Sequence, residues 1–341
     1  MKVYDTAQIR NIAFVGHGHS GKTSLVSSLL YAAKATDKLG SVQDGTAVTD
    51  FDPDEIERKV SMALAVAFAE HDGIKLNFID APGYSNYIGD AAAALRAAES
   101  VVLVVHALDG IAVQTEKMWD DAERRHVPLF FAVTQMDRER AEWNSILGSL
   151  RERYGRTAVP ITIPIGEGPS IRGVVDLISM QAYLPKKGTA EAEIGPIPAD
   201  MTAAAKAARE SLMEVVAEVD DDLMNEFLET NELTQDDLIA GLKKAIMARS
   251  VFPIFACGAN LVANSSDGKV SRARADAAQS PAVLVQNARW SRALSFPILP
   301  CRWFRKSSRP TSMRAGHISL VRVFSGTLGA DTSIERHARQ R

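Results

Sequence analysis

The sequence predicts an α/β fold in which helices cover both faces of a mostly parallel sheet. Strand-like apolar runs alternate with helical patterns from residue 12 to residue 134, as expected when crossover helices join parallel strands. A glycine-rich loop separates the first strand from the first helix. The stretch between Asp137 and Cys257 is longer than one helix and one strand require, so we also expect an inserted subdomain.

The glycine-rich loop follows the strand at residues 12–15, precedes a helix at residues 23–33, and matches the phosphate-binding pattern G-x-x-x-x-G-K-[ST] in full. Its residues are Gly16, His17, Gly18, His19, Ser20, Gly21, Lys22 and Thr23. Glycines let backbone N–H groups close around a β-phosphate, and the helix N-terminus adds positive potential. Lys22 would reach the β- and γ-phosphates, and the Thr23 hydroxyl would hold Mg²⁺. We therefore predict that a nucleoside triphosphate binds at this loop.

A polar stretch at residues 36–58 follows the first helix and is long enough to be a mobile switch loop. Strand patterns then cover residues 62–70 and 74–80. The dipeptide Asp72-Gly73 between them is typical of a hairpin turn, so we expect these two strands to be antiparallel.

The second strand of this hairpin ends at a D-x-x-G motif. The motif consists of Asp80, Ala81, Pro82 and Gly83, with Tyr84 directly after it. Asp80 at the carboxyl end of a strand can hold Mg²⁺ through water, and the Gly83 N–H can bond a γ-phosphate. A D-x-x-G motif in this position is typical of the γ-phosphate sensor of P-loop GTPases.

The remaining elements continue the alternation and then depart from it. The core patterns are helix 85–98, strand 100–105, helix 113–125, strand 128–134 and helix 139–154. Strand-like runs at 159–164 and 173–177 and helical patterns at 201–218 and 234–249 follow, before a last core strand at 251–257. We therefore place an inserted α+β subdomain at about residues 157–250.

A base-reading loop follows the strand that ends at residue 134. It consists of Thr134, Gln135, Met136 and Asp137. A carboxylate at position 137 can accept two hydrogen bonds from guanine N1 and N2, whereas adenine has no donors there and would leave it unpaired. The alternative for Asp137 is an ordinary helix N-cap. Gln135 stands where guanine-specific enzymes carry a lysine that covers the base, so we expect weakened nucleotide affinity.

Together these motifs resemble the translational GTPase family, and its elongation factor G branch most closely. The stretches GHGHSGKT and DAPGY are similar to that family's GHxDxGKT and DTPGH. Residues 57–61 (ERKVS) resemble its ERGIT switch segment, with Ser61 at the Mg²⁺-binding threonine. Residues 255–259 (FACGA) resemble its guanine-contacting CGSA stretch, with Gly258 at the serine and Ala259 after it.

Four departures occur together: Lys59 for glycine, Ser61 for threonine, Tyr84 for histidine and Gln135 for lysine. This set resembles the divergent elongation factor G-like paralogues more than the main translocase. The family's histidine at position 84 positions the attacking water, and a tyrosine cannot supply a partly charged imidazolium near neutral pH. We therefore expect weak hydrolysis.

The resemblance implies a GTPase that binds GTP, GDP and Mg²⁺, works with ribosomal RNA and proteins, and is a monomer. It implies a catalytic group of Lys22, Gly83 and Tyr84 and a metal group of Thr23, Ser61 and Asp80. The nucleotide would also contact the phosphate loop, residues 80–84, residues 134–137, Gly258 and Ala259. The alternative function is a GTP-binding module or gene remnant with little turnover and no translocase activity.

The resemblance divides the chain into three parts. Residues 1–260 form the GTP-binding domain, and residues 315–341 resemble the first strands of the family's second domain, a β-barrel, which we expect to be incomplete at Arg341. Residues 261–314 are basic and lack helical or strand periodicity. We interpret them as a stretch read in a shifted frame; an RNA-binding tail and a lineage-specific linker are the alternatives.

The composition argues against several classes of protein, namely disulfide-rich, membrane-spanning and secreted ones and those that bind a metal through histidine or cysteine. The 341 residues carry a formal net charge of −3 and two cysteines, which does not suggest a disulfide framework. No window approaches the ~18 consecutive apolar residues of a membrane helix, and the N-terminus lacks signal-peptide order. We expect a soluble, cytoplasmic protein with no membrane contact. The histidines show no metal-ligand spacing, and we assign His17 and His19 a structural role.

Overall fold

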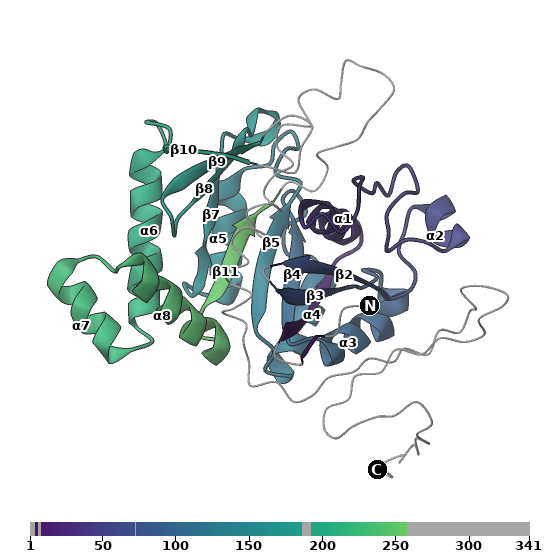
Figure 1. Cartoon of the computed structure of the whole chain (residues 1–341), viewed down its shortest axis with the longest axis horizontal. Coiled ribbons are helices and arrows are strands. Elements are labelled where there is room, and N and C mark those ends of the chain that lie inside the picture. Colours follow the sequence, from purple (N-terminus) through teal and green to yellow (C-terminus); the bar gives the residue numbers. More distant parts are fainter. Residues whose placement is uncertain (1–3, 6–7, 72, 186–191, 258–341) are drawn as a thin grey trace, which may run out of the picture. The chain divides into compact units, whose positions relative to one another are not determined.

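The computed structural model describes residues 4–5, 8–71, 73–185 and 192–257, drawn as coloured ribbons in Figure 1. From Arg10 onward these residues belong to one compact unit. Its main sheet has seven strands in the order β2-β3-β1-β4-β5-β11-β6. The strands are β1 (Ile9–Gly16), β2 (Ala65–His71), β3 (Ile74–Asp80), β4 (Ser100–His106), β5 (Leu129–Thr134), β6 (Ala158–Pro160) and β11 (Phe252–Ala256).

The main sheet is parallel from β1 through β4, β5 and β11 to β6. The expected antiparallel hairpin is confirmed, because β2 pairs with β3 in antiparallel register. Every residue of β5 is buried, so both of its faces are covered, as in other α/β sheets.

Four helices pack against the main sheet or against one another. They are α1 (Lys22–Ala32), α3 (Ile88–Ala97), α4 (Val113–Arg124) and α5 (Trp143–Tyr154). Helix α1 contacts β2 and β3, α4 contacts β4 and α3, and α5 contacts β6. The predicted α/β fold class is confirmed.

The polar stretch that the sequence predicts as a loop contains a short helix, α2 (Pro53–Arg58). A capping box starts it: the Asp52 side chain accepts from a backbone N–H of the first turn, and the Glu55 side chain accepts from the Asp52 N–H. Pro53 at the first helical position adds to this signal. The helix is only six residues long, too short for apolar periodicity to predict it.

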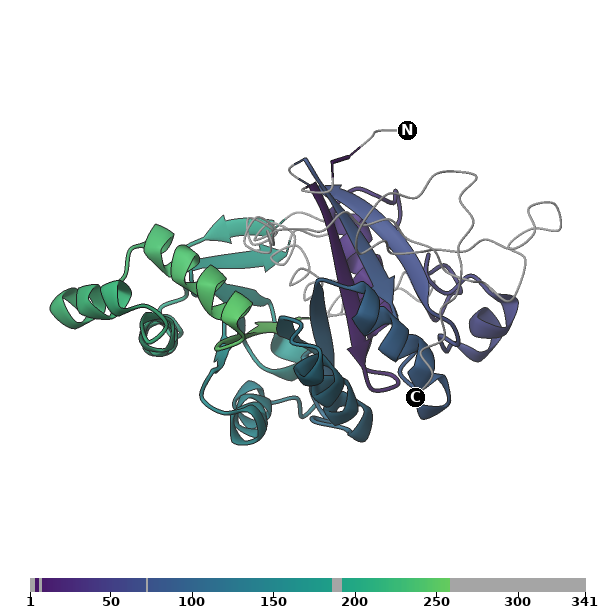
Figure 2. The same ribbon diagram turned by 90° about the horizontal axis from the view of Figure 1, so that it is seen from below.

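The inserted α+β subdomain lies between α5 and β11 in the chain. Its four strands are antiparallel in the order β10-β9-β8-β7: β7 (Thr162–Ile165), β8 (Gly173–Asp176), β9 (Gln181–Pro185) and β10 (Ala192–Gly195). Three helices follow: α6 (Thr202–Ala217), α7 (Asp221–Thr230) and α8 (Gln235–Ala248). Figure 2 shows these helices, in green, together on the side away from the purple N-terminal strands.

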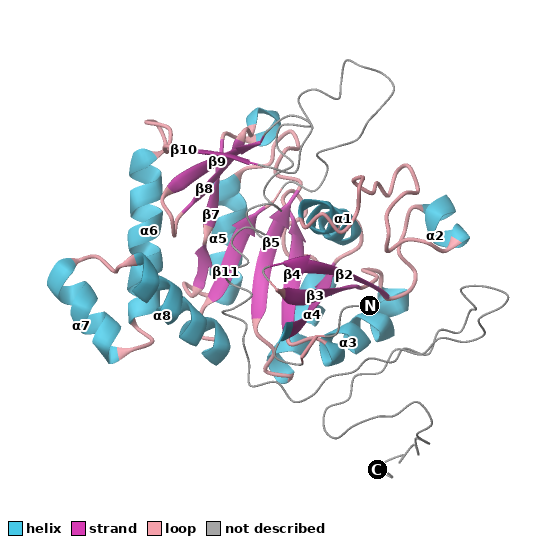
Figure 3. Ribbon diagram, in the orientation of Figure 1, coloured by secondary structure: helices cyan, strands magenta, loops and turns pink. Residues whose placement is uncertain are grey.

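The prediction of one strand over residues 159–164 is wrong, because the chain changes sheets at Ile161. The Ile161 N–H donates to the Ile254 carbonyl of β11 at 2.9 Å, which extends the β6–β11 ladder. The Ile161 carbonyl accepts from the Leu177 N–H at 2.9 Å, which extends the β7–β8 ladder. The strands of the two sheets therefore come together beside β11 and β7 (Figure 3).

Other boundaries differ in smaller ways. The helix predicted at 85–98 begins with a 3₁₀ turn, Ser85–Tyr87, and the one predicted at 139–154 begins only at Trp143. Helix α7 was not predicted; it starts where the Asp220 side chain accepts from the Asp222 N–H. In the described part of the chain, no helix combines the length and apolar character needed to cross a bilayer.

The predictions for residues 261–314 and 315–341, and those for Gly258 and Ala259, lie outside the described residues.

Candidate nucleotide-binding site

The phosphate loop lies between β1 and α1, as the sequence predicts. Gly21 takes the left-handed conformation at φ 82°, directly before the first residue of α1, Lys22. The Lys22 side chain is buried, and its Nζ donates to the His17 carbonyl at 2.7 Å. Burial lowers the Lys22 pKa to about 8, while the negative charges of Asp80 and Asp50 oppose this change. A buried ammonium with one backbone partner is well suited to bind an anion here.

A cluster of side-chain oxygens lies next to Lys22. The Thr23 and Ser61 hydroxyls are 2.9 Å apart, and the Ser61 hydroxyl donates to Asp50 Oδ1 at 2.7 Å. The Thr49 hydroxyl donates to Asp80 Oδ2 at 2.7 Å. The cluster therefore combines the end of β3, the start of α1 and the segment on either side of α2.

The surroundings of the two carboxylates in this cluster disfavour their charged form. Burial raises the Asp50 pKa to about 6, against a hydrogen bond from Ser61 that lowers it. Burial also raises the Asp80 pKa, against hydrogen bonds from Thr49 and Thr23 that lower it. Asp50 Oδ2 and Asp80 Oδ1 are buried and have no hydrogen-bond partner. Such an arrangement is costly unless a cation or donor completes it.

These residues fit Mg²⁺. The ion prefers oxygen ligands, keeps several waters, and is commonly held by one or two carboxylates plus substrate phosphates. Thr23, Ser61 and Asp80, predicted to hold the metal, lie together here, and Asp50 joins them. The described residues contain no group of three or more histidine, cysteine, aspartate and glutamate side chains arranged for a metal. Hydroxyls and phosphates must therefore complete any coordination at this cluster.

Gly83 and Tyr84 lie directly against the phosphate loop. A Cβ at position 83 would lie 2.4 Å from Lys22 Nζ and 2.7 Å from the Gly18 backbone nitrogen, so only glycine allows this approach. The Tyr84 hydroxyl forms a hydrogen bond with His19 Nε2. The segment predicted to sense a γ-phosphate is therefore in contact with the loop predicted to bind phosphates.

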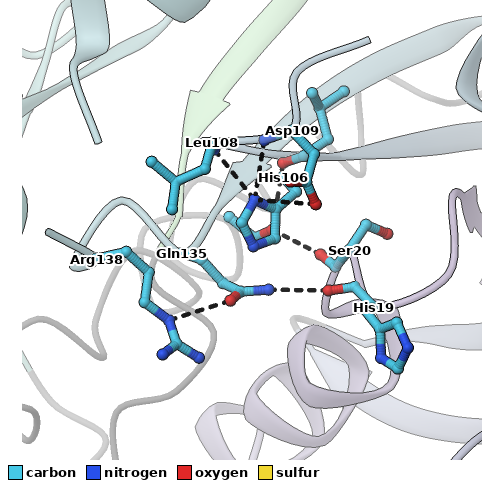
Figure 4. A network of polar contacts seen from close by, with 9 residues as sticks. His19, Ser20, His106, Leu108, Asp109, Gln135 and Arg138 are labelled. Atoms are coloured by element: carbon cyan, nitrogen blue, oxygen red, sulfur yellow. Dashed lines mark hydrogen bonds and ion pairs between the residues drawn. The ribbon is translucent and has the colours of Figure 1, made fainter. Parts of the chain in front are cut away.

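The base-reading loop is also tied to the phosphate loop. The Thr134 hydroxyl donates to the Ser20 carbonyl at 2.6 Å, and Gln135 Nε2 donates to the His19 carbonyl at 2.9 Å. Gln135 Oε1 accepts from Arg138 Nε at 3.2 Å. Figure 4 shows the Gln135 side chain between Arg138 and the His19 carbonyl, with the His19 imidazole on the far side of that carbonyl. Gln135 thus connects the two loops.

Asp137 is the residue of this loop that is predicted to accept hydrogen bonds from the base. Its Oδ1 is buried and has no hydrogen-bond partner, which suits a ligand that donates. Met136 beside it is buried in the core. The Cys257 N–H donates to the Val133 carbonyl at 2.7 Å, so the end of β11 lies beside the start of this loop.

A cavity joins the parts of the site. Its lining includes Lys22, Thr23, residues 59–61, residues 83–84 and Gln135, all from predicted site segments. Asp50 and Arg138 line it too, and the sequence prediction missed both. Asp80 and Asp137 are not part of the lining.

Asp50 was missed because the polar stretch before α2 contains several acidic residues of similar context. Position in the chain does not separate a buried carboxylate from an exposed one such as Asp44. Arg138 directly follows Asp137, the aspartate predicted to read the base, and that adjacency was a usable signal. His106, also drawn in Figure 4, accepts the backbone N–H groups of Leu108 and Asp109 and lies 3.6 Å from the Asp109 carboxylate, so its contacts close a turn.

Comparison with known proteins agrees with this geometry. The family described as the elongation factor Tu GTP binding domain matches residues 7–261. Elongation factor G 2 of Syntrophus aciditrophicus (strain SB) is 33% identical over 257 residues, which are 75% of this chain and 38% of that protein. A crystal structure of a protein from Thermus thermophilus has a TM-score of 0.74 and 26% identity, over 88% of this chain and 43% of that one.

This chain therefore spans about two fifths of the length of either relative. The family match covers the phosphate loop, the oxygen cluster and the base-reading loop, which are the parts that the structure brings around one cavity. The chain belongs to the elongation factor Tu GTP-binding family, and its resemblance is to members of the elongation factor G type.

Proposed function

We propose that this chain binds GTP and GDP with Mg²⁺, hydrolyses GTP to GDP and phosphate at a low rate, and acts with the ribosome in translation elongation. The observation that carries the proposal is the cavity shared by Lys22, the Thr23–Ser61–Asp50 oxygen cluster and the base-reading loop. Family membership supports the guanine nucleotide and the ribosome.

Each group has a role that its position supports. Lys22 would bind the β- and γ-phosphates, and the Gly83 N–H would bond the γ-phosphate. Thr23, Ser61, Asp80 and Asp50 would hold Mg²⁺ directly or through water. When bound, Mg²⁺ neutralises charge on the β- and γ-phosphates.

Guanine specificity rests on Asp137, with Gly258 and Ala259 assigned by resemblance alone. The unpartnered Asp137 oxygen can accept from guanine N1 or N2, whereas adenine would leave it unpaired. We assign residues 1–260 to the GTP-binding domain, with the insertion at about 157–250, of which β6 (Ala158–Pro160) pairs in the main sheet. By family resemblance we expect a cytoplasmic monomer.

The first experiment tests base choice. In titrations with fluorescent GDP and ADP, GDP should bind at least about tenfold more tightly. ADP would leave the Asp137 carboxylate unpaired, and this ratio of affinities corresponds to the free-energy cost of that lost interaction. Asp137→Asn should reverse the preference toward xanthosine diphosphate, whereas the exposed neighbour Glu139→Gln should not. Equal affinities of the wild type for GDP and ADP would exclude the guanine assignment.

The second experiment tests turnover. Single-turnover GTP hydrolysis, measured with and without ribosomes, should be slow, since Tyr84 replaces the family's histidine. Binding without measurable hydrolysis would make the chain a GTP-binding module instead. Strong stimulation by ribosomes would contradict the low rate and leave the ribosomal role in place.

A further inference from the structure

Tyr84 and His19 form a direct contact between the γ-phosphate-sensing segment and the phosphate loop. The Tyr84 hydroxyl is hydrogen-bonded to His19 Nε2, and the two rings pack edge to face with centroids 5.5 Å apart and planes at 86°. The residues are 65 positions apart in the sequence. His19 stands where the family's phosphate loop carries an aspartate, and Tyr84 stands where the family carries a histidine after DxPG. The two substituted residues are therefore in contact with each other.

Gly18 leaves space for this pair. A Cβ at position 18 would lie 3.0, 3.1 and 3.3 Å from three atoms of the Tyr84 ring. Any side chain at this position would therefore push the ring away from the loop. The tyrosine lies over the backbone of Gly18 because that residue has no side chain.

The backbone that carries the His19 imidazole is fixed from the other side. His19 has φ 61°, the left-handed conformation that few residues adopt readily. Its carbonyl accepts from Gln135, and the next carbonyl, of Ser20, accepts from Thr134. The base-reading loop thus sets where the imidazole projects, and Figure 4 shows the ring beyond the carbonyl that Gln135 holds.

We propose that His19 is a positioning residue for Tyr84, and that the pair orients the water that attacks the γ-phosphate. The proposal rests on the proposed GTP hydrolysis. With the imidazole proton on Nδ1, the phenol donates to Nε2 and its oxygen keeps lone pairs for a hydrogen bond from water. A donating hydroxyl becomes a stronger acceptor, because neighbouring hydrogen bonds polarise one another. No proton transfer to Tyr84 is involved, since phosphoryl transfer to water depends mainly on positioning.

The location of the hydroxyl supports this role. Tyr84, His19 and Lys22 line the same cavity, and Gly83 beside Tyr84 is in contact with Lys22 Nζ. A γ-phosphate bound by Lys22 and the Gly83 N–H would therefore lie beside the Tyr84 hydroxyl. From the sequence we expect a structural role for His19 as a residue of the phosphate loop, and its contact with Tyr84 adds the positioning role proposed here.

Four variants test the pair by single-turnover GTP hydrolysis with ribosomes, at saturating GTP and Mg²⁺. His19→Asn tolerates a positive φ but is too short to reach the phenol, whereas His19→Gln keeps an acceptor at about the reach of Nε2. Tyr84→Phe removes the hydroxyl, and His19→Asn/Tyr84→Phe measures coupling. His126→Asn is the matched control, because His126 also has a positive φ of 54° and lies outside the site.

His19→Asn and Tyr84→Phe should each slow hydrolysis about tenfold, the effect of one lost hydrogen bond in the transition state, and the double variant should be no slower than either. His19→Gln should recover most of the rate. Affinity for fluorescent GDP should fall by less than the hydrolysis rate, because an interaction made only in the transition state does not contribute to ground-state binding. A wild-type rate in His19→Asn, multiplied losses in the double variant, or a faster His19→Asn would overturn the proposal.

A spectroscopic measurement distinguishes this inference from the proposed function. In protein with ¹⁵N-labelled histidine rings, Tyr84→Phe should shift the His19 Nε2 resonance, which His19→Asn identifies. An unchanged resonance would overturn the pairing whatever the hydrolysis rate. A wild type that fails to bind guanine nucleotide would instead overturn the proposed function, and the binding titration detects that separately.

Discussion

Asp50 should destabilise the nucleotide-free protein at neutral pH while supporting Mg²⁺ binding. Burial raises its pKa from 3.8 to about 6. A carboxyl with a raised folded-state pKa binds more protons when folded than when unfolded between these two values. The free energy of unfolding therefore falls as pH rises from about 4 to about 6, and the full cost is present above that window.

The size of the cost follows from the pKa change. A shift of about two units corresponds to about 3 kcal/mol. Screening by water at the open cavity lowers a realistic value to about 1–2 kcal/mol. Asn at position 50 keeps an oxygen that can accept from Ser61 and removes the charge. Asp50→Asn should therefore raise the free energy of unfolding by about 1–2 kcal/mol at pH 7.5 without Mg²⁺, and have little effect at pH 4.

Urea unfolding at pH 4 and pH 7.5, with and without Mg²⁺ and GDP, measures both sides of this prediction. Asp50→Asn should gain less stability from Mg²⁺ and GDP than the wild type does. Asp44→Asn is the matched control, since Asp44 is exposed in the same polar stretch. If Asp50→Asn is less stable than the wild type at pH 7.5 without Mg²⁺, or behaves like Asp44→Asn, the reasoning is refuted.

Two further predictions follow from packing. Gly18→Ala should displace the Tyr84 ring and slow GTP hydrolysis. Gly89→Ala is the control and should not slow it, because a Cβ there meets nothing within 4 Å. Equal hydrolysis rates for the two variants would contradict the close fit of the Tyr84 ring over the phosphate loop. Burial raises the pKa of the Cys257 thiol, so this thiol should be alkylated at pH 8 only in the presence of denaturant. Mass spectrometry of the peptide that contains Cys257 measures the labelling. Equal labelling rates in native and denatured protein would show that the end of β11 opens readily.

The sequence predicts the parts of the site that consist of consecutive residues. The phosphate loop, the D-x-x-G segment and the base-reading loop each have their own pattern, and the alternation of strands and helices places each at the carboxyl end of a strand. The structure brings them around one cavity for this reason. The antiparallel hairpin of β2 and β3 was equally readable from its Asp-Gly turn.

The remaining features depend on contacts between distant residues, which local patterns do not encode. Asp50 differs from Asp44 only in what packs around it. The Tyr84–His19 contact forms because β3 and β1 are neighbours in the sheet, so the segments that follow them meet. The break at Ile161 was unpredictable because the apolar run continues through it while the hydrogen-bond partners change.

The change of sheets at Ile161 joins the two sheets without an intervening loop. Ile161 donates to one sheet through its N–H and accepts from the other through its carbonyl, and the hydroxyl of the next residue, Thr162, accepts from the Ala256 N–H at 2.9 Å. Ala256 is the last residue of β11, and Cys257 after it bonds to β5 just ahead of the base-reading loop. The insertion is therefore joined by backbone hydrogen bonds to the end of β11, and that end is bonded to the strand that leads into the base-reading loop, so a displacement of the insertion at Ile161 should also move the start of that loop.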